Sequence, residues 1–445
     1  MKIIKKTLFI FCFATALAFL YSAEMELTLE RAQELATNQN SDIKKQEIEL
    51  ASAQRADKNA WNSLIPSLSL NGGISNSHTI SDGKTFFPKD SSSWSWSGSA
   101  GISIGLNTAI PIKAKITSLT YSSAKTAYSK LVSNTRLQAT TSFYNLLSQQ
   151  KNIAILEESL NLAKKQYDQV NANYKNGLAS ELELLKARYS YQSIQPRITQ
   201  AQTSYQNSLS SFLQLLGLDA GTQIKFKDNT SIKKLNLPPA DKLADEFVEN
   251  RFDVIQAREA LIRAQLSESL SKHSAYSPSI NISESLRSGS EIKKDAKTPG
   301  LNGSFSVSVS IPLNGYIPGS NDNLSIKNSK DSVSTAAISL ENVIKNARQD
   351  INNKTAELVR LYESLATNRL NSTIAEKAYE LSVQSYNAGL LSQTELATQR
   401  QELITAKQTL SEAESNYLVS IYNLAAALNI PVNELLSKYG AKNEE

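Results

Sequence analysis

The 445-residue sequence has very few of the residues that build nucleophilic or metal-binding sites. It contains one cysteine, Cys12, and two histidines, His78 and His273. A thiol nucleophile or a histidine-rich metal site is therefore not expected, and the sequence offers no nucleophile–base constellation. We predict that the protein is not an enzyme and that it uses no cofactor and no metal.

Glycine and proline are also scarce, with 16 and 11 residues. Because these residues interrupt or end helices, their scarcity favours long uninterrupted helices. The net charge is +5, and it falls to +2 without residues 1–23. So weak a balance predicts no nucleic-acid partner.

The N-terminal segment has the layout of a secretory signal peptide. It has a lysine-rich start, an apolar run from Leu8 to Leu20, and the small residues Ser22 and Ala23 at its end. We predict a signal peptide over residues 1–23 and therefore an exported protein. The rest of the chain has no apolar run near 20 residues, so we expect no membrane-crossing helix.

Two stretches with one pattern organise the chain, Tyr174–Ser180 and, 212 residues later, Tyr386–Ser392. Each interrupts a long helical pattern at a single glycine. Glycine can supply the positive φ that ends a helix, and the following serine can cap the next helix. We therefore predict that each stretch is the bend of a helical hairpin. Glu183 and Glu395 would begin the return helices, where the helix dipole favours negative charge.

The remaining sequence repeats around these bends, which predicts an internal duplication. Each half has the order helix, strand, loop, strand, long helix, bend, long helix. Pro196 is expected to kink or locally unwind the first return helix. The expected segments are a first repeat over 24–217, an equatorial linker over 218–240 with at most one short strand, a second repeat over 241–430, and a short polar C-terminal tail over 431–445.

Apolar and polar residues alternate in two pairs of predicted strands. One interpretation is a soluble sheet with one wet face. The other is a set of membrane strands, since strands of about ten residues with one apolar face can cross a bilayer, and Trp94 and Trp96 fit an interfacial belt. Four strands cannot close a barrel alone, so a membrane barrel would be shared between chains. The runs cover residues 66–76, 94–106, 278–288 and 303–312.

Several motifs together resemble the TolC-like outer membrane efflux proteins. They are the opening Leu27–Ala32, the strand start Pro66–Leu70, and the duplicated Tyr-x-x-Gly-Leu-x-Ser bends. Each motif is loose, but their duplicated order is specific and covers about residues 24–432. The resemblance implies a mainly α fold with a membrane β-barrel. A homotrimer would form a long α-helical barrel in the periplasm and a shared 12-stranded β-barrel in outer membrane lipid, with four strands per chain.

The resemblance also implies functional residues at the bends. The residues that match the tips that dock a periplasmic adaptor protein are Gly177, Leu178, Ser180, Gly389, Leu390 and Ser392. Glu183 and Glu395 match acids at the periplasmic entrance, although each can also be a solvent-facing acid at a helix start. Leu391 stands where a gate-latching arginine can occur, and Thr398 stands where a second entrance aspartate can occur. These departures put a salt-bridged acidic gate in doubt.

The function implied is a passive exit duct of a tripartite efflux or type I secretion system. An inner-membrane pump of the RND or ABC type would drive it through the adaptor. The alternative is a periplasmic or surface coiled-coil scaffold or adhesin without a pore, because coiled-coil seams alone indicate interaction and not transport. The sequence does not identify the cargo.

Overall fold

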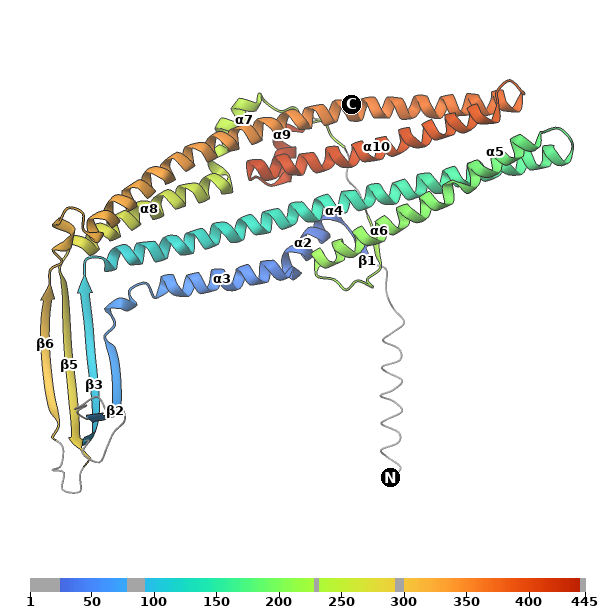
Figure 1. Cartoon of the computed structure of the whole chain (residues 1–445). Helices are drawn as coiled ribbons and strands as arrows, with labels where there is room; N and C mark the ends of the chain where they lie inside the picture. The colour runs from blue at the N-terminus through green and yellow to red at the C-terminus, as the bar shows by residue number, and fades with distance from the viewer. Residues whose placement is uncertain (1–24, 78–92, 228–231, 293–299, 441–445) are drawn as a thin grey trace, which may run out of the picture. The chain divides into compact units, whose positions relative to one another are not determined.

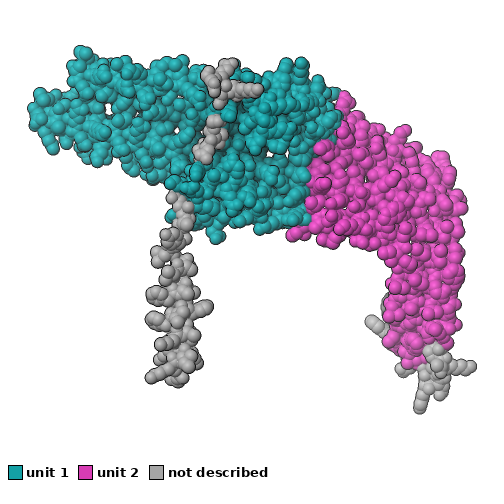
Figure 2. Space-filling view, turned by 180° about the vertical axis from the view of Figure 1, so that it is seen from behind, with its two compact units in different colours: residues 1–47, 127–254, 344–445 teal, residues 48–126, 255–343 magenta. Residues whose placement is uncertain are grey.

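The computed structural model describes residues 25–77, 93–227, 232–292 and 300–440. The predicted signal peptide and nearly all of the loop predicted between the first two strands, over 77–93, lie outside the described residues. So does much of the corresponding loop in the second repeat. The chain divides into two compact units (Figure 2). Unit 1 comprises residues 1–47, 127–254 and 344–445, and unit 2 comprises residues 48–126 and 255–343.

Long helices dominate the chain (Figure 1). The helices with residues in both units are α3 (Ser41–Lys58), α4 (Ile110–Lys175), α8 (Phe252–Tyr276) and α9 (Asn321–Asn387). The helices of unit 1 are α2 (Leu29–Gln39), α5 (Glu181–Gln192), α6 (Ile194–Leu216), α7 (Ala240–Phe247), α10 (Gln393–Leu428) and α11 (Val432–Tyr439). Across the described residues, no helix combines the length and the apolar character needed to cross a membrane.

Unit 2 contains a four-stranded antiparallel sheet in the order β2-β3-β5-β6, whose strands lie side by side (Figure 1). Each strand end lies within three residues of its predicted position. The two outer strands, β2 and β6, each pair with only one neighbour among the described residues. The strands are β2 (Ser67–Ser77), β3 (Ser93–Asn107), β5 (Ser279–Glu291) and β6 (Asn302–Ser310).

The register of this sheet separates two chemically different faces. Direct cross-strand partners point to the same face, and successive residues alternate between faces. One face carries a row of hydroxyls, with 2.8 Å between the Oγ atoms of Ser67 and Ser103. The same distance separates the Oγ atoms of Ser283 and Ser306 in that row. The next row lies on the opposite face and consists of Leu68, Ile102, Glu284 and Phe305.

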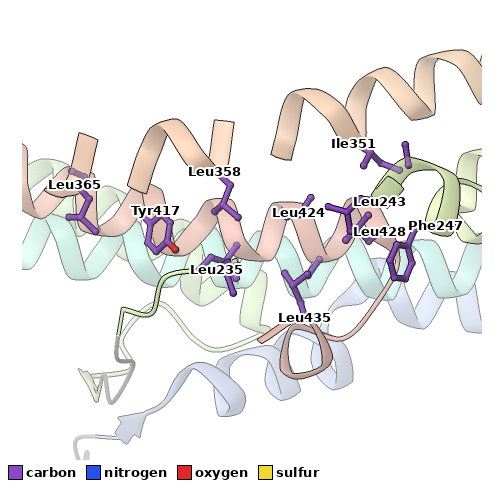
Figure 3. Close-up of a cluster of buried hydrophobic side chains, with 14 residues drawn as sticks. Leu235, Leu243, Phe247, Ile351, Leu358, Leu365, Tyr417, Leu424, Leu428 and Leu435 are labelled. Carbon is purple, nitrogen blue, oxygen red and sulfur yellow. The ribbon is translucent and has the colours of Figure 1, made fainter. Parts of the chain in front are cut away.

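The largest buried cluster of unit 1 joins the second hairpin to segments outside it (Figure 3). Side chains of α9 and α10, such as Leu358 and Leu424, pack with Leu243 of α7 and Leu435 of α11. Leu435 is fully buried. The prediction of a polar tail after Pro431 was therefore wrong. Its few apolar residues fall on one face of a short helix, and this face is buried against the hairpin.

The linker contains the one short strand that the sequence allowed. Its short strand is β4 (Ile224–Phe226), which pairs in parallel with β1 (Met25–Leu27). Leu27 and Phe226 pack with Phe143 and Phe212 in a second cluster of unit 1, so the start of the chain and the linker share one core.

Two prolines mark where the helices begin or break. α4 begins at Ile110, and Pro111 lies in its first turn, where a missing N–H costs no helical hydrogen bond. In the first return segment, α5 ends at Gln192 and α6 begins at Ile194. This interruption at Ser193, three residues before Pro196, confirms the predicted local unwinding.

Candidate functional site

Both predicted bends are helix-ending turns with the same backbone geometry. Gly177 has a φ of 72° and Gly389 a φ of 73°, in the left-handed region that favours glycine. In the first bend, Gly177 N donates to Tyr174 O at 3.0 Å and Leu178 N donates to Asn173 O at 2.8 Å. This hydrogen-bond pair is the Schellman motif.

The second bend repeats the motif, with Gly389 N donating to Tyr386 O at 3.0 Å and Leu390 N to Ser385 O at 2.9 Å. A Cβ atom built on Gly177 or Gly389 would meet no heavy atom within 4 Å. The need for glycine at these positions therefore comes from φ alone and not from packing.

Ser180 and Ser392 cap the return helices, as the sequence predicted. Each serine Oγ accepts from the backbone N of the glutamate three residues later, at 3.2 Å. The glutamates complete two capping boxes, since Glu183 accepts from Ser180 N at 2.8 Å and Glu395 from Ser392 N at 2.9 Å.

The capping box gives both glutamates a local structural role. The hydrogen bond from the Ser392 backbone holds the pKa of the Glu395 carboxyl below its ordinary value. The interpretation as helix-start acids therefore has a direct basis in the geometry. A role at a periplasmic entrance stays a prediction for both Glu183 and Glu395.

Contacts between side chains hold the two hairpins together near their bends. Gln169 of α4 donates to Asn387 of α9 at 3.3 Å. Farther along, Lys186 Nζ donates to Thr394 Oγ1 at 3.2 Å. Both hairpins turn at the same end of unit 1 (Figure 1). The structure thus brings all six predicted docking residues to one end of this unit.

The bends present apolar side chains to solvent. Leu178 is 77% exposed and Leu390 is 82% exposed. In the first hairpin an exposed apolar row continues along α5 with Leu182, Leu185 and Tyr189. Their alternating three- and four-residue spacing puts them on one helix face. The corresponding residues of α10 are Thr394, Ala397 and Gln401, so only the first hairpin carries this apolar row.

A groove lies beside the bends, between α5 and α6 on one side and α10 on the other. Its volume is 280 Å³, and its lining contains no acidic residue. The lining includes three cationic side chains, Lys186, Arg197 and Arg400. Arg197 donates to Gln401 at 2.9 Å, so both it and Lys186 are held by neutral groups.

Arg400 is the functional candidate that the sequence reasoning missed. It is only 7% exposed, it donates a hydrogen bond to Ser190 Oγ, and burial lowers the pKa of its guanidinium. Among the described residues it forms no ion pair with a carboxylate. The sequence did contain a signal for this residue, because Arg400 lies on the same helix face as the apolar residues Leu396 and Leu403.

No group of three or more potential metal ligands occurs in the part of the chain that the structure describes. The candidate site therefore consists of the bends, the exposed row on α5 and the basic groove.

Known proteins share the sequence pattern and the fold of this chain. A family model described as outer membrane efflux protein matches residues 32–218 and again residues 243–429. The chain is similar to the outer membrane protein TolC of Escherichia coli (strain K12), with 22% identity over 333 residues, or 69% of this chain. The match spans 65% of the length of TolC.

Solved structures share the fold at low sequence identity. CusC superimposes with a TM-score of 0.74 at 16% identity, covering 92% of this chain and 93% of CusC. VceC of Vibrio cholerae gives 0.74 at 14% identity, covering 91% and 96%. The Campylobacter jejuni CmeC outer membrane channel gives 0.74 at 16%, covering 92% and 88%. The resemblance inferred from the sequence is thereby confirmed. The chain belongs to the outer membrane efflux protein family.

Proposed function

We propose that the protein is the passive exit duct of a tripartite efflux or type I secretion system in the outer membrane. Three chains would assemble around a common axis. Substrates would enter from the periplasm or from an inner-membrane pump of the RND or ABC type and leave to the outside. The chain itself would carry out no reaction.

The observation that carries this proposal is the two-faced sheet of unit 2. One face is lined mainly by serine, glycine and asparagine and also carries Arg287 and Glu291. The other presents Leu68, Leu70 and Phe305 at 81%, 85% and 69% exposure. An exposed apolar face of this kind needs an apolar environment. Its strand lengths of 9 to 15 residues are sufficient to cross a bilayer.

The two outer strands give the reason for a trimer. Unpaired strand edges cannot be exposed to lipid, because no water is present to satisfy their N–H and C=O groups. Pairing β2 of one chain with β6 of the next removes the edges. Three chains with four strands each would form a closed 12-stranded barrel, with its hydroxyl face toward water.

The bends are proposed to dock the coiled-coil hairpin of a periplasmic adaptor protein. The docking residues would be Gly177, Leu178 and Ser180 of the first bend, with Gly389, Leu390 and Ser392 of the second. The support is their position at one end of unit 1 and the exposure of the two leucines, next to a basic groove without acids.

The experiment that tests the duct is a conductance measurement on the purified full-length protein. Trimers in detergent that produce discrete conductance steps in planar bilayers would support it. A coiled-coil scaffold or adhesin would give no conductance and would leave membranes in high salt.

The orientation of the sheet can be tested with neighbouring residues. Ile102→Arg, on the apolar face, should cost about 2–4 kcal/mol near the bilayer midplane and reduce trimer yield. Ser103→Arg, on the hydroxyl face, should be tolerated because that face lines water. Equal loss of trimer from both variants would contradict the barrel assignment.

A further inference from the structure

The two return segments are related residue by residue, without insertion. The first runs from Glu181 to Leu216 and the second from Gln393 to Leu428. Both begin after a serine in a capping box and both end at a left-handed residue, with φ of 70° at Gly217 and 56° at Asn429. A shift of 212 residues therefore maps one segment onto the other at both ends.

Within one chain, the junction between the two hairpins is visible in the groove. There α10 presents Thr394, Ala397 and Arg400 toward α5, and Arg400 donates to Ser190 Oγ. This contact joins the second hairpin to the first. A trimer built from duplicated hairpins contains a second kind of junction, in which the first hairpin of one chain meets the second hairpin of its neighbour.

The 212-residue shift identifies the residues of that second junction. The position that corresponds to Arg400 in the first repeat is Arg188, and the position that corresponds to Ser190 in the second repeat is Glu402. The hydrogen bond seen inside one chain thus maps onto two opposite charges on different chains. We propose that in the trimer Arg188 of each chain forms an ion pair with Glu402 of the neighbouring chain. This inference rests on the trimer of the proposed function.

The surroundings of both residues agree with a covered junction. Arg188 and Glu402 are exposed, and neither forms a hydrogen bond or ion pair with another described residue. The apolar row beside Arg188 includes Leu182 and Leu185, at 62% and 54% exposure. These leucines correspond to Thr394 and Ala397, which lie in the junction inside the chain. The neighbouring chain is therefore the occupant that would cover the row.

Within one chain, Arg400 donates to the neutral hydroxyl of Ser190. The proposed contact between chains instead joins two opposite charges. Opposite charges across an interface fix register and exclude wrong pairings. Three such pairs per trimer would distinguish the junction between chains from the junction within a chain. They would thereby select the closed trimer over other arrangements of six similar hairpins.

A charge-exchange experiment on the full-length protein tests the pair. Arg188→Glu puts two acids in each junction, and Glu402→Arg puts two bases there. Each should lower the amount of trimer that survives a fixed detergent and temperature challenge by about tenfold, since close interfacial charge pairs couple strongly. The double variant Arg188→Glu with Glu402→Arg should restore trimer survival. Survival of the double variant no better than that of the single variants would overturn the pairing.

A cross-linking experiment keeps the inference testable if the charge variants fail to assemble. Arg188→Cys with Glu402→Cys, treated with a short bis-maleimide, should give cross-linked dimers and trimers of the polypeptide. Each single cysteine variant is the control and should stay at monomer size on a denaturing gel. Intact, conducting trimers without cross-links would contradict the ion pair but not the proposed function as a duct. Absence of any trimer in the unmodified protein would contradict the proposed function itself.

Discussion

The two hairpins have nearly identical bends but differ in what supports the helix after the bend. Both bends share the φ value, the Schellman hydrogen bonds and the capping box. After the second bend, α10 continues unbroken for 36 residues, and Gln393 and Leu396 in its first turn are already buried. After the first bend, α5 spans 12 residues and buries only Ala187.

The difference shows that bend geometry and surrounding packing are specified separately. The turn is encoded locally by a glycine, a serine and a glutamate, and this local code is present twice. The packing depends on contacts with distant residues, and these differ between repeats. The first hairpin keeps an exposed apolar face, which the neighbouring chain of the proposed trimer would cover, while α10 is part of the core of its own chain.

The largest effect is expected from the bend glycines. Gly389→Val should cost about 1–2 kcal/mol locally, because a side chain disfavours positive φ. It should abolish transport in an efflux assay while trimer yield stays near normal. Gly177→Val should act in the same direction but less strongly, because α5 is less constrained by packing and can shift.

Gly389→Asn is the matched control, since asparagine tolerates the left-handed region better than other residues with a side chain. It should retain most of the transport activity. Equal loss from Val and Asn would show that the effect comes from the side chain and not from φ.

The next effect concerns a tyrosine that both repeats share. Tyr417 is 1% exposed and donates to Lys233 O at 2.7 Å, whereas Tyr205 is half-buried and has no hydroxyl partner among the described residues. Tyr417→Phe should lower the free energy of unfolding by about 1–2 kcal/mol, since it leaves the carbonyl without its donor. Tyr205→Phe should change it little. Chemical unfolding of both variants checks the comparison, and equal losses would contradict it.

Alkaline pH offers a second measure of the same difference. Burial raises the pKa of Tyr417 to about 12. Because the folded pKa lies above the unfolded one, the stability contributed by neutral Tyr417 is complete below about pH 10 and is lost as pH rises toward 12. The Tyr417→Phe variant should lose less stability over this range. An identical alkaline profile for both proteins would contradict the prediction.

A smaller and equal effect is expected from the two caps. Ser180→Ala and Ser392→Ala should each destabilise the return helix by about 1 kcal/mol, because each removes an N-cap acceptor. Hydrogen exchange in the first turn of α5 and α10 would report the loss. A much larger effect in one hairpin would contradict the prediction that the two caps contribute equally.

The smallest expected effect distinguishes the capping role of Glu395 from any role of its negative charge. Glu395→Gln keeps an acceptor for Ser392 N, so the cap should persist. If three copies of Glu395 line an entrance, periplasmic-side divalent cations should block conductance, and the glutamine variant should weaken that block. Glu183→Gln should weaken it less. Unchanged block in both variants would leave only the capping role.

Acid pH should affect the second bend through the same residue. The hydrogen bond from Ser392 lowers the pKa of Glu395, so its contribution is present above the unfolded pKa and is lost as pH falls through the lower folded value. Hydrogen exchange at the start of α10 should therefore accelerate only at acid pH, and less so in Glu395→Gln.

The sequence predicted the features that have a local cause. Gly177 and Gly389, the caps Ser180 and Ser392, and the alternating strands all follow from residues close together in the chain. The break at Ser193 follows from Pro196 in the same way. For these elements, short-range stereochemistry is sufficient.

The features that were missed depend on contacts between distant segments. The pairing of β1 with β4 joins residues about 200 positions apart, and nothing in either strand identifies its partner. Leu435 is buried only because the second hairpin lies against it. Arg400 belongs to a groove that exists only once two hairpins have packed together.

The most direct test of the docking role is transport by a variant with a charge at the second bend. Leu390→Asp changes a side chain that is 82% exposed and has no part in the core. Asn371→Asp adds the same charge at an exposed position of α9 away from the bend. We expect Leu390→Asp to abolish efflux with normal trimer yield and normal bilayer conductance, while Asn371→Asp transports normally. Normal efflux by Leu390→Asp would contradict the docking role of the bends.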